Sequence, residues 1–183
     1  MTTTKKCILA LVLSWTLLFS TCNIQADLTE AANIIAVLVP IIQQLIPIVV
    51  KGNAAVANDA NLALDAANAA SSGINGYMDV PNATNLQKAQ ASVAALVAAD
   101  TTLQQAGVLA GSSDTTVGVI LGVIKSSVAA IAAVVNGQTA PGTTAMAAMK
   151  YAGQKVVVGV NAKGVKSVFN RQAGKDSRLK PLK

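Results

Sequence analysis

The chain contains no histidine, and both of its cysteines, Cys7 and Cys22, lie among the first 26 residues. The rest of the chain therefore has no disulfide, no zinc site built on thiol or imidazole ligands, and no histidine general base. A Gly-x-Ser-x-Gly nucleophile motif is also absent from the sequence. We expect a protein that is not an enzyme, with no catalytic residues, no cofactor and no metal site.

Aromatic residues make up only 3% of the chain and charged residues 12%, whereas hydrophobic residues reach 52%. A core must therefore be built from Ala, Val, Ile and Leu, and so low a charge content argues against a disordered, solvated chain. The 157 residues from position 27 onward are enough for one domain. The fold class that we predict is mainly α, an Ala/Val-rich bundle of about four helices over residues 27–152.

The first 26 residues have the layout of a bacterial export signal. Lys5 and Lys6 give a positive start, residues 8–19 are apolar, and small or polar residues follow up to Ala26. An apolar segment this short is shorter than the roughly 20 residues that a membrane-spanning helix needs. We predict that residues 1–26 are a signal peptide and that the protein works in the bacterial cell envelope, in the periplasm or anchored to a membrane.

Two cleavage sites compete within this signal. Ile24-Gln25-Ala26 suits ordinary signal peptidase and would leave a chain that begins at Asp27. Residues 19–22, Phe-Ser-Thr-Cys, resemble a bacterial lipobox, which would make Cys22 a lipidated first residue and tether the protein to a membrane. Thr21 and Phe19 both depart from the usual lipobox pattern. Both readings stay open.

The segment that follows the signal predicts a two-faced helix beginning at Asp27. Asp27 and Glu30 have the spacing of a capping box, and residues 31–50 carry no charge. On a helix, the apolar side chains lie on one side. The polar side chains lie on the other side, together with Pro40 and Pro47. This segregation favours a core helix of a bundle over a membrane span or an interfacial helix. The predicted apolar face consists of Ile34, Ile35, Leu38, Ile41, Ile42, Leu45 and Val49.

Three further helices are predicted, over residues 53–72, 84–107 and 114–136. The first is carried by alanine, the second has an apolar stripe that we expect to leave Asp100 on the wet side, and the third begins after the N-cap Asp114. In the third, Gly118, Gly122 and Ser126 form a stripe of small residues at the spacing used for close helix packing. We assign these three residues to packing within the bundle first and to self-association second.

Beyond residue 143 the character of the sequence changes. A short helix of Ala and Met is expected over residues 144–152. Residues 153–170 are predicted to form a β-hairpin, with Val156, Val158 and Val160 facing Val165 and Phe169 across a turn at residues 161–164, or else a short helix. Gly159, Gly164 and the β-branched residues favour the hairpin.

Positive charge is concentrated at this end. Residues 150–183 hold nine Lys or Arg against Asp176, a net charge of +8, whereas residues 27–149 carry a net charge of −4. In an envelope protein such cations face anionic lipid or an acidic envelope polymer, and the range lacks the repeated interleaving of aromatic residues that would favour nucleic acid. We expect residues 171–183 to form a basic, disordered tail. The predicted contacts to an anionic surface are Lys155, Lys163, Lys166, Arg171, Lys175, Arg178, Lys180 and Lys183.

These features together predict an exported, non-catalytic cell-envelope protein, either a lipoprotein or a periplasmic protein, that acts by binding or as a structural component. The alternative is a membrane-active protein, in which the apolar helices at residues 31–50 and 117–135 insert and self-associate as a holin-like or pore-forming assembly.

Overall fold

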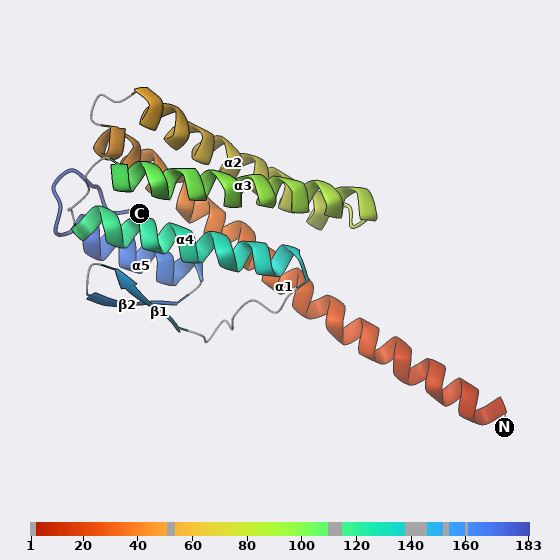
Figure 1. Ribbon diagram of the computed structural model, residues 1–183. Coiled ribbons are helices and arrows are strands. Elements are labelled where there is room, and N and C mark those ends of the chain that lie inside the picture. The colour runs from red at the N-terminus through yellow and green to blue at the C-terminus, as the bar shows by residue number, and fades with distance from the viewer. Residues whose placement is uncertain (1–2, 51–53, 110–114, 138–145, 152–153, 160) are drawn as a thin grey trace.

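The computed structural model describes residues 3–50, 54–109, 115–137, 146–151, 154–159 and 161–183, with side chains for residues 25–50, 54–105, 116–137 and 161–183. These residues form a mainly α-helical bundle in the order α1, α2, α3, α4, β1, β2, α5 (Figure 1). The predicted helical fold class is therefore confirmed.

Helix α1 (Thr3–Val50) runs without interruption through the predicted signal and the first helix of the bundle. Its amino-terminal part projects beyond the other helices as a single rod (Figure 1). The predicted helix start at Asp27 is wrong, because residues 24–26 contain no helix-breaking residue and the helix simply continues. Thr29 illustrates this, since its hydroxyl donates to the carbonyl of Gln25, 2.8 Å away in the preceding turn.

The apolar face that the sequence assigned to residues 34–49 is the centre of the core. All seven of its predicted members are buried, and Leu28 and Ala31 extend the same face toward the amino end. The helix continues through Pro40 and Pro47. Pro40 is half-buried and Pro47 is exposed, so the sequence-based prediction of a two-faced helix is confirmed.

Helices α2 (Ala54–Asp79) and α3 (Ala83–Leu109) pack together as a hairpin along most of their length (Figure 1). Their buried residues recur at alternating spacings of three and four, the pattern of a coiled-coil seam. Alanine fills most of the α2 side, so the two backbones approach closely. At Gly73 an added Cβ would lie 2.5 Å from Ser92 Oγ and 3.1 Å from Ala89 Cα. The seam consists of Val56, Ala60, Ala63, Ala67, Ala70 and Ile74 on α2 and Ala89, Val93, Leu96, Asp100 and Leu103 on α3.

Helix α4 (Thr115–Val135) packs against α1, α3 and α5, and most of its residues are buried. The helical periodicity of this segment predicts a stripe of large apolar residues, and all of its members are buried: Val117, Ile120, Leu121, Ile124, Val128, Ile131 and Val135. Gly118 and Gly122 on the opposite side are buried as well. The helix ends at Val135 and is followed by a turn at Gly137, whose φ of 69° is favourable for glycine.

The region after α4 differs from the sequence-based expectation. Strands β1 (Met146–Tyr151) and β2 (Gln154–Gly159) pair as an antiparallel hairpin, where we expected a short helix followed by a first strand. Helix α5 (Ala162–Ala173) occupies the place of the expected second strand, so the hairpin predicted over 153–170 is wrong and its alternative, a short helix, is found in this part of the chain. The helix is selected because Asn161 caps its start, and because its buried side chains recur at spacings of three and four: Val165, Val168, Phe169 and Ala173.

Candidate functional site

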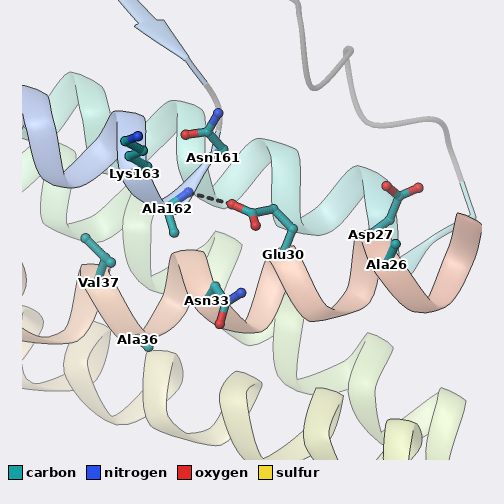
Figure 2. Close-up of a pocket in the computed structure, with 9 residues that line it drawn as sticks. All are labelled: Ala26, Asp27, Glu30, Asn33, Ala36, Val37, Asn161, Ala162 and Lys163. Carbon is teal, nitrogen blue, oxygen red and sulfur yellow. Dashed lines mark hydrogen bonds between the residues drawn. The ribbon is translucent and has the colours of Figure 1, made fainter.

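The predicted basic end of the chain is built on α5, whose first turn is fixed from two directions. The side chain of Asn161 accepts a hydrogen bond from the amide of Gly164 at 2.7 Å. From α1, the carboxylate of Glu30 accepts one from the amide of Ala162 at 2.6 Å (Figure 2). A carboxylate at a helix amino end satisfies an otherwise unpaired amide and complements the helix dipole. Glu30 thus positions α5 against α1.

The C-terminal segment, residues 174–183, turns back from α5 and lies against the bundle. On α1, the side chain of Gln44 accepts from the amide of Lys180 at 2.6 Å and donates to the carbonyl of Lys180 at 3.1 Å. On α5, Asn170 does the same with Leu182, accepting at 2.7 Å and donating at 3.0 Å. Leu179 is buried in the core. The expectation of a disordered tail is therefore not supported.

An ion pair closes the turn that leads into this segment. Arg178 contacts the carboxylate of Asp176 at 2.6 Å, and its backbone amide also donates to that carboxylate at 3.0 Å. Hydrogen bonds from Arg178 lower the pKa of Asp176 to about 2. The bond from the Arg178 side chain has the largest effect, and the bond from its backbone amide has the next largest. Asp176 is therefore ionised at every pH above about 4, and the turn keeps its ion pair at neutral pH.

Most of the described cations of this end are exposed on this ordered framework. Arg178 is engaged with Asp176, and Lys166, which is half-buried, donates to the main-chain oxygen of Lys183. Lys155 in β2 and Cys22 in α1 lie outside the residues whose side chains are described. We call the following exposed residues the basic face: Lys163, Arg171, Lys175, Lys180 and Lys183.

A hollow of about 720 Å³ opens between residues 26–37 of α1 and the start of α5. Figure 2 shows Asp27 and Glu30 on one side and Asn161 and Lys163 on the other. Its carboxylates and amides can hydrogen-bond to a polar molecule. Glu30 already serves α5, however, and among the described residues no group of three or more Asp, Glu, Cys or His side chains could hold a metal ion.

Sequence reasoning misplaced one buried acid, Asp100, which it assigned to the wet side of its helix. Asp100 lies in the seam of α3, only 6% exposed. Gln104 donates one hydrogen bond to its carboxylate at 3.0 Å and another to the carbonyl of Leu121 on α4 at 2.9 Å. Burial raises the pKa of Asp100, while Gln104 and the charge of Lys125 act in the opposite direction. Asp100 follows Val93 by one heptad, just as Leu103 follows Leu96. This spacing is the sequence pattern that predicts a buried position for Asp100.

The small-residue stripe of α4 lies within the bundle rather than on an open surface. Gly118 and Gly122 are buried, and the hydroxyl of half-buried Ser126 donates to the carbonyl of Gly122 at 3.0 Å. Small residues at such positions permit close approach of neighbouring helices, and the packing role of these three residues stays a prediction.

Two described segments are long and apolar enough to cross a membrane, Gln25–Val50 and Thr116–Val135, each with a mean hydropathy of 2.2. In an 18-residue stretch of each segment, 44% of the residues of the first and 67% of those of the second are buried within the bundle. Such segments are only weak evidence of membrane association, because the core helix of a bundle can have the same length and composition.

Comparisons with protein-family models, with curated proteins and with solved structures found no match for this chain.

Proposed function

We propose that this chain is an exported, non-catalytic cell-envelope protein that binds anionic surfaces through its basic face. The observation that carries the proposal is the ordered display of the cations of α5 and the C-terminal segment. Hydrogen bonds from Gln44 and Asn170 hold the backbone, and the charges remain exposed. Cations that are held in place lose less conformational entropy on binding than cations on a disordered tail.

The partner that fits this face is an anionic lipid leaflet or an acidic envelope polymer. Near an anionic membrane each Lys or Arg contributes roughly 1 kcal/mol. Between exposed charges this attraction is screened by salt, with a Debye length of about 8 Å at physiological ionic strength. Binding should therefore weaken steeply as salt is added.

Vesicle sedimentation of the processed chain tests the proposal. Replacing Lys163, Arg171 and Lys175 by Gln should lower the affinity for vesicles with anionic lipid by about 100-fold, which corresponds to roughly 1 kcal/mol per cation. Lys88 is equally exposed but lies on α3, far from this end in the sequence. The control Lys88→Gln should bind like the native chain.

The same experiment separates the two kinds of partner. A soluble acidic polymer added in competition should displace the protein from vesicles if the polymer is the preferred ligand. Equal binding of the triple variant and the native chain would refute a role for the basic face.

Export and anchoring require a separate measurement, since both cuts in the signal remain proposals. The intact mass of the processed protein distinguishes a chain that begins at Asp27 from one that begins at an acylated Cys22. In the second case Cys22→Ala should abolish the added lipid mass. An unprocessed chain in the cytoplasm would contradict the proposal.

The alternative function is membrane insertion by the two apolar segments. Their length and hydropathy favour it, whereas the burial of both apolar faces in one shared core favours the bundle. Processed protein without lipid that resists extraction by carbonate and releases dye from vesicles would support insertion. We expect extraction and no dye release.

A further inference from the structure

The C-terminal segment is bound to the rest of the chain in the manner of a peptide ligand. Gln44 and Asn170 each use both the donor and the acceptor of their amide on the N–H and C=O of a single residue, Lys180 and Leu182. This two-point pairing is what a neighbouring β-strand offers to an extended peptide, and it reads the main chain rather than a side chain. We call the surface formed by Gln44, Lys166 and Asn170 the α1–α5 docking surface.

Two apolar side chains add sequence selectivity to this main-chain recognition. Leu179 is 4% exposed and belongs to the core, and Leu182 packs against it partly buried. Lys166 contributes a further hydrogen bond to the main-chain oxygen of Lys183. The docking surface therefore selects a segment with leucines three residues apart and leaves the intervening Lys180 and Pro181 exposed.

None of these contacts depends on the covalent connection between the segment and its own α5. Six residues, 174–179, separate the end of α5 from the first paired residue, Lys180. An identical segment from a neighbouring molecule would make the same hydrogen bonds and bury the same leucines. Exchange of an identical element between copies is a low-cost route to a dimer.

From this arrangement we infer that the α1–α5 docking surface is a peptide-binding site whose partner in trans is the C-terminal segment of a second copy of this chain. In dilute solution a molecule's own segment occupies the site, because a short linker gives it an effective concentration in the millimolar range. Exchange becomes significant when copies are crowded. A tethered or surface-bound population is crowded in this way.

Complementation between two defective full-length variants tests the inference. The first, Gln44→Ala with Asn170→Ala, has a defective docking surface and an intact segment. The second, Leu179→Ser with Leu182→Ser, has an intact docking surface and a defective segment. The two variants carry different affinity tags and are mixed. They should co-purify at least tenfold above the background, which is measured with each variant paired with itself. Only the mixture offers an intact docking surface and an intact segment that are both free.

A matched control changes amides that do not pair with the segment. Gln43→Ala with Asn75→Ala removes two exposed amides, on α1 and α2, and this variant should co-purify with the segment-defective partner no more than the native chain does. Circular dichroism of each variant establishes that the helices are formed. Background-level co-purification of folded complementary variants would overturn the inference.

A direct binding measurement covers the case in which the double leucine variant does not fold. The single variant Lys180→Pro removes the amide that donates to Gln44 and keeps both leucines. A fluorescent peptide with the sequence of residues 174–183 should bind this full-length variant at least tenfold more tightly than a peptide with Ser at both leucine positions. Equal binding of the two peptides would refute a selective site.

Discussion

At the residue scale, the least expected group in the bundle is the carboxyl of Asp100, because every other position of the seam is filled by Ala, Val, Leu or Ile. A buried carboxylate opposes folding unless its partners compensate for the loss of hydration. Gln104 and Lys125 compensate only in part, because burial is the largest influence on the pKa of Asp100 and raises it. The folded state therefore holds the proton of Asp100 more tightly than the unfolded chain does.

A pH dependence of stability follows from this shift. Because the folded pKa lies above the unfolded value of 3.8, the contribution of Asp100 to stability falls as pH rises from about 3.8 through the folded pKa. Asp100→Asn keeps an acceptor for Gln104 and removes the charge. We expect this variant to have a higher melting temperature than the native chain at pH 7 and the same melting temperature near pH 3.

Thermal melts of both proteins between pH 3 and pH 8 measure this difference. Asp65→Asn is the control, because Asp65 is exposed on α2, and its substitution should leave the profile unchanged. A native profile retained by Asp100→Asn would show that the carboxyl is not responsible.

At the scale of the elements, helices α2 and α3 depend on close backbone approach more than on large side chains. The two helices approach closely at Gly73, since an added Cβ would lie 2.5 Å from Ser92 Oγ and 3.1 Å from Ala89 Cα. Gly76 lies three residues further along α2, and an added Cβ there would meet nothing within 4 Å. The two glycines form a matched pair in one helix.

We expect Gly73→Ala and Gly76→Ala to shift stability in opposite directions. Gly73→Ala should lower the free energy of unfolding by about 1–3 kcal/mol, because the helices must separate or Ser92 must move. Gly76→Ala should raise it by about 0.5–1 kcal/mol, because alanine loses less backbone entropy in a helix. Urea denaturation of both variants gives the comparison, and a stabilising Gly73→Ala would mean that the helices are not held this closely.

The elements also show how far the sequence alone predicts this fold. The apolar faces of α1 and α4 followed directly from helical periodicity, because both faces enter one core. Helix α5 did not, since Gly164 and the neighbouring valines have weak helix propensity, and the stabilising contacts come from elsewhere. Glu30 accepts a hydrogen bond from the amide of Ala162, although the two residues are 132 positions apart in the sequence. No local sequence pattern predicts such a contact.

The same reasoning applies to the candidate site. Composition located the cations of residues 150–183, and five of the eight predicted contact residues form the exposed basic face. The backbone that supports these cations is held by the hydrogen bond from Lys180 to Gln44, and the two residues are 136 positions apart in the sequence. An amide on the polar side of α1 carries no sequence signal of this role.

At the scale of the whole molecule, α1 joins two regions with different environments. Its amino-terminal part extends beyond the bundle (Figure 1), while from Leu28 onward its apolar face is the centre of the core. A cut after Ala26 would fall between these regions and retain Leu28, Glu30 and Ala31. Either proposed cleavage therefore leaves the contacts of the described core in place.

A pair of truncations tests this division of α1. A chain that begins at Asp27 should unfold at the same temperature as a chain that begins at Cys22, because the additional residues precede the first buried position of the described core. A chain that begins at Asn33 lacks Leu28 and Ala31 from the core and the carboxylate that caps α5. Its free energy of unfolding should be lower by several kcal/mol, since loss of one buried leucine side chain alone costs about 2–5 kcal/mol. Calorimetry of the three chains provides the measurement, and a large loss already at Asp27 would place part of the signal segment within the folded core.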